Sequence, residues 1–346
     1  MSLNNFTPVL PVGSLILVTG VNGLIGSHIA NEALKLGYRV RGVVRAKNKI
    51  AGLKKRWDEQ FPGQFEVAVV PDLQVEGAYD DAIKGVSGFA HVSAISGDWT
   101  TDLSAAVSTV KNLEFRALEA AAKTPSVKRF VLTSSIVATD GAAAGDGSKL
   151  DIPRQIKQDT WYEEGLELAK KEGELQVMAV YASSKMLGEK AAWEWVKEHK
   201  PSFDFYVVSP AFTIGEVLDA SQHGSTAGWF QTLYHSSPTP FIKNVEALYW
   251  ISTTDIALLH LGALLLPSST LPPQRIFGTA ASTNPNEWLA VFRELKPGKE
   301  FLPDFPGKKV DRATYDTEGA VTILKAFGQE QGFKSLKQAI SENLPK

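Results

Sequence analysis

The chain has 346 residues, which is enough for one large α/β domain or two ordinary domains and far more than a small disulfide or zinc module needs. Its 36 Lys and Arg residues against 38 Asp and Glu residues give a net charge of −2, too small a cationic excess for a nucleic-acid-binding surface. The absence of Cys excludes disulfides and Cys-ligated zinc. Because no signal peptide or membrane span is visible either, we expect a cytoplasmic protein that does not enter the membrane.

Short apolar segments alternate with longer helical patterns along the chain. Candidate strands lie at residues 15–19, 39–44, 65–70, 88–92, 129–133, 205–208 and 275–278. Most of them are almost continuously apolar, which is typical of strands that helices bury on both faces. The pattern predicts an α/β fold with a doubly wound parallel sheet of about seven strands.

The first candidate strand leads directly into a glycine-rich turn. Gly20, Gly23 and Gly26 lie in this turn, and an amphipathic helix follows and ends near Gly37. Glycine lets the backbone turn tightly and approach a pyrophosphate, which the N–H groups at a helix start can bind. The order predicts a dinucleotide-binding loop, although an ordinary tight turn is the alternative. The expected binding residues are Thr19, Gly20, Asn22, Gly23, Leu24, Ile25 and Gly26.

The second candidate strand ends in cations, where an NAD-binding protein usually carries an acidic residue. Arg45 and Lys49 can bind a 2′-phosphate through their N–H donors, which favours NADP(H) over NAD. Asp72, just after the third strand, can accept a hydrogen bond from the adenine amino group. The alternatives are that Arg45 and Lys49 are ordinary surface cations and that Asp72 caps a turn.

The fifth candidate strand ends at Ser135, and residues 181–185 read Tyr-Ala-Ser-Ser-Lys at the start of a predicted helix. Tyr181 and Lys185 are four residues apart, so a helix places both side chains on one face. A neighbouring ammonium makes a phenol a stronger acid, which suits Tyr181 to proton donation. Since ligands bind beyond the carboxyl ends of parallel strands, we expect Ser135, Tyr181 and Lys185 to meet there.

Two later blocks differ in composition from the rest of the chain. Residues 211–249 are rich in Ser, Thr, Gly, Pro and aromatic residues, and residues 281–346 combine short helices with Pro-containing loops. We expect these blocks to form a smaller C-terminal lobe that binds the substrate. Residues 1–210 plus 250–280 then form the dinucleotide-binding domain.

These motifs resemble those of the extended short-chain dehydrogenase/reductase family, especially its dihydroflavonol-reductase-like branch and the fungal NADPH-dependent aldehyde and ketone reductases. The resemblance extends over residues 18–26, 42–45, 89–91, 124–135, 181–185, 209–215 and 251–257. It implies a Rossmann-type domain in which Ser135 orients a substrate carbonyl, Tyr181 protonates its oxygen and Lys185 also holds the nicotinamide ribose. It further implies that Leu73 joins Asp72 at the adenine, that Ser93 and Ala94 flank the cofactor, and that Pro210 lines the nicotinamide pocket.

The chain departs from the family pattern in two helices. Asn112 lies where related chains have a small residue, and we do not expect it to be catalytic. Leu113 and Glu114 replace the usual Gly-Thr pair. Gly188 interrupts the helix of Tyr181 and costs about 1 kcal/mol of helix stability relative to Ala. We expect these departures to affect packing more than chemistry.

The expected walls of the substrate pocket are aromatic and mostly uncharged: Trp99, Phe212, Trp229 and Phe230. Such a pocket accepts bulky aldehydes, ketones or ketoesters better than phosphorylated or nucleotide-linked sugars, which would need Arg or Lys clamps. The alternative for each aromatic residue is a place in the core. No pair of His residues has the spacing of a metal site, so no metal is expected.

The sequence therefore predicts an enzyme, an NADPH-dependent carbonyl reductase that acts on a small-molecule substrate as a monomer or homodimer. Two other functions remain open at this point. One is a nucleotide-sugar epimerase or dehydratase on the same scaffold, and the other is a non-catalytic protein that senses NADP.

Overall fold

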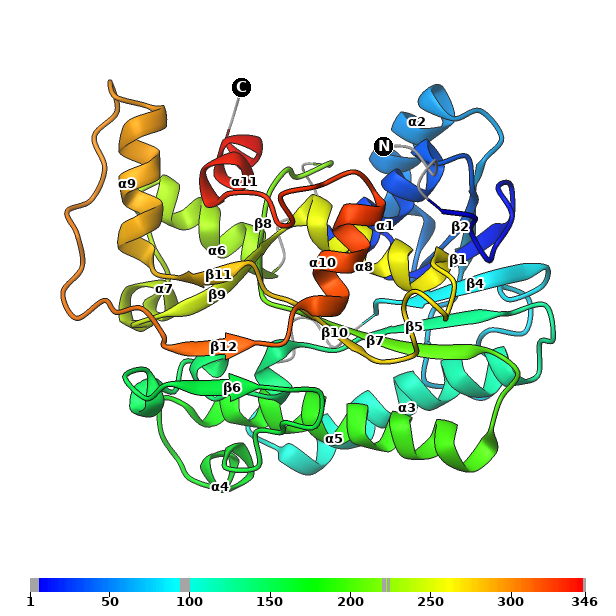
Figure 1. Ribbon diagram of the computed structural model, residues 1–346, viewed down its shortest axis with the longest axis horizontal. Coiled ribbons are helices and arrows are strands. Elements are labelled where there is room, and N and C mark those ends of the chain that lie inside the picture. Colours follow the sequence, from blue (N-terminus) through cyan, green and yellow to red (C-terminus); the bar gives the residue numbers. More distant parts are fainter. Residues whose placement is uncertain (1–5, 94–99, 220–221, 223–224, 345–346) are drawn as a thin grey trace.

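The computed structural model describes residues 6–93, 100–219, 222 and 225–344, and its centre is a seven-stranded parallel sheet (Figure 1). The strand order is β10-β7-β5-β4-β1-β2-β3. All seven predicted strands are confirmed, and none of their ends is shifted by more than two residues. The strands are β1 (Leu15–Thr19), β2 (Arg39–Val44), β3 (Phe65–Val69), β4 (Val86–His91), β5 (Arg129–Thr133), β7 (Asp204–Pro210) and β10 (Arg275–Gly278).

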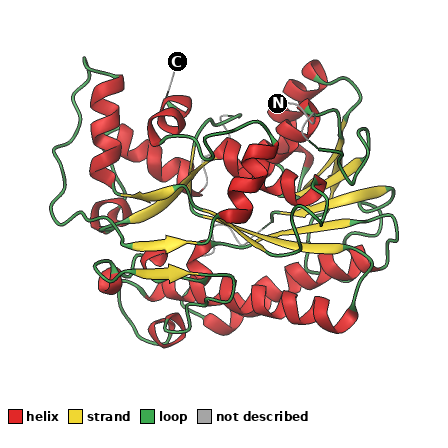
Figure 2. Cartoon of the chain, in the orientation of Figure 1, coloured by secondary structure: helices red, strands yellow, loops and turns green. Residues whose placement is uncertain are grey.

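Helices cover both faces of this sheet, as Figures 1 and 2 show. One face carries α1 (Leu24–Lys35), α8 (Thr253–Leu265) and α10 (Glu318–Ala326), and the other carries α3 (Leu103–Ala122) and α5 (Gln176–His199). In β1, Ile16 and Val18 join the core under α8, whereas Leu15 and Leu17 join the core under α3. Burial on both faces explains why most of these strands are almost continuously apolar.

The outer edge of the sheet and the short connections complete this part of the molecule. Helix α2 (Ala51–Gln60) packs along β3 and follows the short 3-10 turn η1 (Lys47–Ile50). The connection from β5 to α5 contains the 3-10 turns η2 (Ile136–Ala138), η3 (Ala142–Ala144) and η4 (Gly147–Lys149), strand β6 (Arg154–Ile156) and helix α4 (Gly165–Ala169). In the described part of the chain, no helix is both long enough and apolar enough to cross a membrane.

A second group of elements packs beside the β7 and β10 end of the sheet. Its three-stranded sheet has the order β11-β9-β8, and its apolar core includes Phe230, Trp288 and Phe292. Strand β12 (Ala313–Tyr315) instead pairs in parallel with β6. The other elements are β8 (Phe212–Ile214), β9 (Leu248–Ser252), β11 (Ala281–Thr283), α6 (Ser225–Tyr234), α7 (Pro240–Asn244), α9 (Pro285–Leu295) and α11 (Leu336–Asn343).

Candidate active site

The residues singled out in the sequence follow the carboxyl ends of neighbouring strands. The order of the strands reverses between β1 and β4: β1, β2 and β3 follow one another toward one side of the sheet, and β4, β5, β7 and β10 toward the other. Ligands of open α/β sheets bind at such a reversal. The polar and glycine residues therefore line one continuous edge. From β3 to β7 this edge carries Asp72, Arg45, Gly20, Ser93, Ser135 and Pro210.

The glycine turn after β1 has the geometry of an anion-binding loop. Gly20 has a φ of +61°, and its carbonyl oxygen accepts a 2.9 Å hydrogen bond from the Gly23 N–H. A Cβ atom at Gly26 would lie 2.4 Å from the Gly20 carbonyl oxygen, so the close turn requires glycine there. No side chain caps the start of α1, which leaves its first N–H groups to a ligand. These features fit the pyrophosphate of a dinucleotide.

Thr19 joins the ends of β1 and β4 beneath this loop. Its Oγ1 atom accepts hydrogen bonds from the N–H groups of Val92 (2.9 Å) and Ser93 (3.0 Å) and lies 3.2 Å from His91 Nδ1. Burial, with a smaller contribution from the charge of Lys185, lowers the pKa of His91 to about 3, so the imidazole is neutral. These hydrogen bonds hold Ser93 close to the glycine loop. The Ser93 backbone nitrogen lies 3.3 Å from the position that a Cβ atom on residue 20 would occupy.

The predicted phosphate-binding cations lie at the end of β2. Arg45 and Lys49 are both exposed, and neither forms an ion pair with any residue that the structure describes. At the end of β3, Asp72 Oδ1 accepts a 2.8 Å hydrogen bond from the Gln74 N–H, and Leu73 is buried. The Asp72 carboxylate thus forms the turn contact that was the alternative to adenine binding, while its exposure leaves it accessible to a ligand.

The end of β5 and helix α5 meet through Lys185. Its Nζ atom donates a 3.1 Å hydrogen bond to the carbonyl oxygen of Thr133, two residues before Ser135. Helix α5 also packs against η2, the turn that Ser135 caps. Tyr181 is partly buried on the same helix, whereas Lys185 is almost completely buried. The structure therefore brings the helix of Tyr181 and Lys185 to the strand end that carries Ser135.

Glu189 anchors this arrangement one turn further along α5, and the sequence motifs did not indicate it. Its Oε2 atom accepts a 2.6 Å hydrogen bond from the Ser134 hydroxyl group, and its Oε1 atom accepts a 2.7 Å bond from Arg275 Nε. Glu189 lies on α5, Ser134 directly after β5 and Arg275 on β10, and both ionic side chains are buried. This buried ion pair, in which both Glu189 oxygens accept hydrogen bonds, joins α5 to the sheet.

A second buried carboxyl group lies beside Lys185. Glu114 on α3 places its Oε1 atom 3.9 Å from Lys185 Nζ, and its Oε2 atom has no hydrogen-bond partner among the described residues. Burial raises the pKa of Glu114 to about 7, although the charge of Lys185 acts in the opposite direction. The sequence marked Glu114 as a departure from the family pattern without indicating this contact.

Gln222 connects the glycine loop to the segment after β8, which the sequence also did not indicate. Its Nε2 atom donates to the carbonyl oxygens of Asn22 (3.2 Å) and Gly23 (3.1 Å) and to Ser27 Oγ (2.8 Å). Its Oε1 atom accepts from the N–H group of Leu218 (3.0 Å). Because these contacts join positions about two hundred residues apart, no local pattern carries them.

The predicted pocket aromatics occupy different surroundings. Phe230 is fully buried and packs against Trp288 and Phe292 with ring centroids 5.4 Å and 5.2 Å away. Trp229 is partly exposed and packs against Phe241 at 4.8 Å, and Phe212 lies 6.4 Å from Trp229. Trp99 and Ala94 lie outside the described residues.

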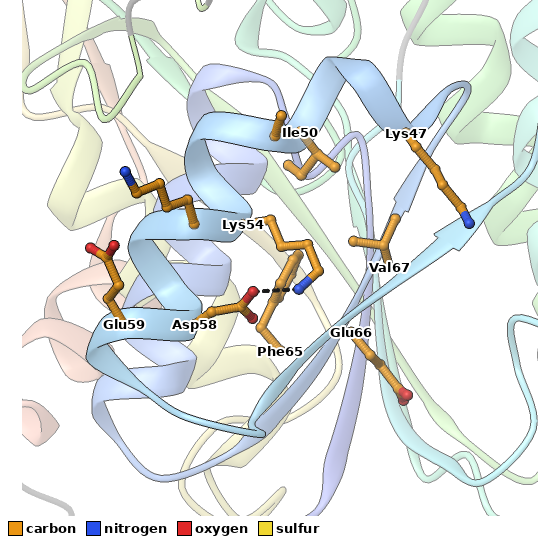
Figure 3. A pocket seen from close by; sticks show the side chains of 10 residues that line it. Lys47, Ile50, Lys54, Asp58, Glu59, Phe65, Glu66 and Val67 are labelled. Carbon is orange, nitrogen blue, oxygen red and sulfur yellow. Dashed lines mark hydrogen bonds and ion pairs between the residues drawn. The ribbon is translucent and has the colours of Figure 1, made fainter.

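A separate pocket opens between α2 and the edge strand β3 (Figure 3). Phe65, Ile50 and Val67 form its apolar part, and an ion pair between Lys54 and Asp58 crosses it. None of the predicted catalytic or cofactor-binding residues lines this pocket. Within residues 6–93, 100–219, 222 and 225–344, no group of His, Asp and Glu side chains is arranged to hold a metal ion.

The chain is similar to known proteins over almost its whole length. A model described as the NAD dependent epimerase/dehydratase family matches residues 16–274. Aldehyde reductase 2 of Sporidiobolus salmonicolor is 41% identical over 339 residues, which cover 96% of each chain. Ketoreductase adrE of Penicillium rubens is 36% identical over 304 residues, which cover 87% of this chain and 86% of that protein.

Solved structures share the same architecture. Yeast methylglyoxal/isovaleraldehyde reductase Gre2, solved in complex with NADPH, superimposes with a TM-score of 0.76 at 25% sequence identity. The match covers 95% of this chain and 96% of the yeast protein. This chain and the yeast reductase therefore share one fold over almost their whole lengths.

Proposed function

Because this chain belongs to the NAD dependent epimerase/dehydratase family, we propose that it is an NADPH-dependent carbonyl reductase, which converts aldehydes, ketones or ketoesters to alcohols. The predicted resemblance to fungal aldehyde and ketone reductases is confirmed by relatives with those names. The partner is a small-molecule carbonyl compound. We propose further that the enzyme works as a monomer or homodimer in the cytosol, whose reducing conditions fit a chain without Cys.

The observation that carries this proposal is the hydrogen bond from Lys185 Nζ to the Thr133 carbonyl oxygen, 3.1 Å long. It joins the helix that bears Tyr181 to the strand end that bears Ser135, and it lies on the sheet edge that also bears the glycine loop. A proton donor, a hydroxyl group and a dinucleotide-binding loop on one edge are what carbonyl reduction needs.

The cofactor would bind along this edge, with its pyrophosphate at the start of α1. Arg45 and Lys49 would hold the 2′-phosphate, because both are exposed cations at the end of β2. Asp72 and Leu73 would border the adenine, and Ser93 and Pro210 would border the nicotinamide half. Bound NADPH supplies the hydride that adds to the carbonyl carbon.

The chain's own residues supply the proton and the orientation. The Ser135 hydroxyl group donates a hydrogen bond to the carbonyl oxygen and holds it beside Tyr181. The Tyr181 phenol transfers its proton to that oxygen, which forms the alcohol and leaves a phenolate. The Lys185 ammonium, held by Thr133, stabilises the phenolate by its charge. Solvent then returns one proton for each turnover.

The first test replaces the proton donor. We expect Tyr181→Phe to bind NADPH with unchanged affinity and to lose at least about 100-fold in kcat, because the variant keeps the ring but has no proton to give. The measurement follows NADPH absorbance with a panel of an aryl aldehyde, an α-dicarbonyl and a β-ketoester. Cofactor affinity is measured separately by fluorescence titration.

Tyr79→Phe is the matched control, because it removes a buried hydroxyl group that has no partner among the described residues. We expect this variant to keep wild-type turnover. Wild-type kcat in Tyr181→Phe would contradict the assigned proton donor. Tightly bound NAD in the purified protein, without net consumption of NADPH, would instead support an epimerase or dehydratase of the same family.

A further inference from the structure

Glu114 is buried next to the ammonium group of Lys185, but the contact lacks the hydrogen bond that a structural ion pair would have. The side chains of both residues are about 95% buried, yet Nζ and Oε1 are 3.9 Å apart, too far for a hydrogen bond. The other oxygen, Oε2, has no partner in the described part of the chain. Lys185 Nζ donates a hydrogen bond to the carbonyl oxygen of Thr133 instead.

Glu189 shows what a structural carboxylate looks like in the same helix layer. It accepts hydrogen bonds from Ser134, Arg275 and Trp193, so both of its oxygens are occupied. Its charge is balanced by Arg275 at 2.7 Å and does not depend on Lys185. Glu114 has no comparable set of donors in the described part of the chain, and the main positive charge that balances its ionised form is that of Lys185.

The approach of α5 to α3 depends on a small residue next to this carboxyl group. A Cβ atom at position 188 would lie 3.0 Å and 3.2 Å from the two oxygens of Glu114 and 2.4 Å from Val110 Cγ1. Gly188 therefore makes room for the carboxyl group between the helices, which lie side by side in Figure 1. The two departures from the family pattern, Glu114 and Gly188, are parts of one arrangement.

We propose that Glu114 is a positioning residue for the reduction, whose ionisation opposes the charge that Lys185 presents to Tyr181 and thereby slows proton donation. This inference rests on the proposed function. With Glu114 neutral, the ammonium group acts fully on the phenol and makes it a stronger acid. With Glu114 ionised, a negative charge 3.9 Å away cancels part of that effect.

The groups around Glu114 determine the pH range of this effect. Lys185 favours the ionised carboxyl group, Glu189 on α5 disfavours it, and Lys111 on α3 itself favours it weakly. On β4, His91 stays neutral because burial lowers its pKa to about 3. Burial outweighs the attraction of Lys185 and raises the pKa of Glu114 to about 7, within the physiological range.

The test is the pH dependence of kcat at saturating NADPH and benzaldehyde, between pH 5.5 and 9. We expect wild-type kcat to fall roughly three- to tenfold as the pH rises through about 7, the effect of one partly screened charge near the phenol. Glu114→Gln keeps the size of the side chain and cannot ionise. We expect its kcat to show no step near neutral pH and to exceed the wild-type value at pH 8.

Two further variants separate this effect from a general loss of charge or packing. Glu114→Asp keeps a carboxyl group, and we expect it to restore a step in the profile. Glu119→Gln removes a partly exposed carboxylate that pairs with Arg116 on the same helix, and we expect the wild-type profile there. A step retained in Glu114→Gln, or a wild-type profile without a step between pH 6 and 8, would overturn the inference.

A measurement that needs no turnover complements the kinetics. In wild-type protein labelled with 13C at the Glu carboxyl groups, NMR should show one Glu that titrates near pH 7, and Glu114→Asp should remove that signal. If every Glu titrates near its ordinary value, the inference fails even where the enzyme is active. If the wild-type enzyme consumes no NADPH with any carbonyl compound, the proposed function fails instead.

Discussion

Arg45 stands at the end of β2 with an exposed guanidinium group and without an ion pair to any residue in the described ranges. A guanidinium group binds phosphate through a fork of N–H donors, and a hydrogen bond to a charged group contributes roughly 1.5–3 kcal/mol. A carboxylate at this position would repel the 2′-phosphate and accept hydrogen bonds from ribose hydroxyl groups instead. One side chain can therefore determine which of the two cofactors binds.

Arg45→Asp tests this role. We expect the KM for NADPH to rise roughly 10- to 100-fold, the equivalent of one lost charge-assisted contact, and the KM for NADH to change far less. The measurement is the ratio of kcat/KM values for the two cofactors with the same aldehyde. Arg39→Asp makes the same charge change at the opposite end of β2 and should leave the ratio unaltered. An unaltered ratio in Arg45→Asp as well would remove Arg45 from the phosphate site.

At this scale, the sequence predicted residues whose role follows from a local pattern. Ser135 and Lys185 could be placed on one edge because a strand end and an i, i+4 helix spacing are visible over a few positions. The contacts of Glu114 and Gln222 were not predictable in this way. They depend on how α3 packs on α5 and how the segment after β8 lies against the glycine loop, and long-range packing leaves no periodic signal.

At the scale of elements, the strands of the central sheet were predictable, whereas those of the smaller sheets, including the five-residue β9, were not. The strands of the central sheet are apolar on both faces, so their sequences differ sharply from the helices around them. By contrast, β6, β8, β11 and β12 have three residues each, too few for a period-2 pattern. Their pairing is set by the elements they connect, as in the parallel pair of β6 and β12.

The contact between α3 and α5 leads to a prediction about Gly188. In an isolated helix, Gly188→Ala would stabilise by about 1 kcal/mol. Here the new Cβ atom would lie 2.4 Å from Val110 Cγ1, so the helices must separate or a side chain must leave its rotamer. We expect overpacking to dominate and the free energy of unfolding to fall by roughly 1–3 kcal/mol in urea denaturation.

The matched control for this prediction is Gly298→Ala. A Cβ atom at position 298 has no atom within 4 Å, and the residue lies in an exposed turn after α9. We expect its free energy of unfolding to stay within about 0.5 kcal/mol of the wild-type value. If Gly188→Ala were as stable as Gly298→Ala, the two helices would have to be more loosely packed than they are here.

On the scale of the whole molecule, buried charges hold the parts together. Arg154 on β6 donates to Asp140 and Asp311 at 2.8–2.9 Å, which joins the turn before η3 to the segment before β12. Arg275 and Glu189 join β10 to α5 in the same way. The pairs of Arg154 with Asp311 and of Arg275 with Glu189 link chain segments far apart in the sequence, so unfolding one segment would leave a buried charge in the other without its partner.

Whereas the buried ion pairs hold the parts of the molecule together, the neutral buried His residues make the fold sensitive to acid. His260 is buried with both nitrogens bonded: Nδ1 donates to the Ile256 carbonyl oxygen, and Nε2 accepts from the Thr133 hydroxyl group, each at 2.8 Å. Burial lowers the pKa of His260 to about 4 and that of His91 to about 3, and it lowers the pKa of His28 as well. Protonation would turn Nε2 from an acceptor into a donor and place a charge in this buried site.

These shifts predict how stability changes with pH. Below pH 6.5 the unfolded chain protonates these His residues while the folded chain does not, so their contribution to stability is lost as the pH falls. Glu114 acts in the opposite sense, because its raised pKa makes the folded state bind a proton between pH 4.5 and about 7. Three His residues outweigh one Glu, and we expect the free energy of unfolding to fall by roughly 1–3 kcal/mol per pH unit from pH 6.5 to 5.5.

Urea denaturation at pH 7.5, 6.5 and 5.5 measures this dependence, and His260→Gln assigns part of it. Gln can donate to a carbonyl group and accept from a hydroxyl group, yet it does not titrate. The variant should therefore lose stability more slowly with acid, by about one proton's share, or roughly 1 kcal/mol per pH unit. Equal slopes in the two proteins would contradict the assignment of this part of the acid sensitivity to His260.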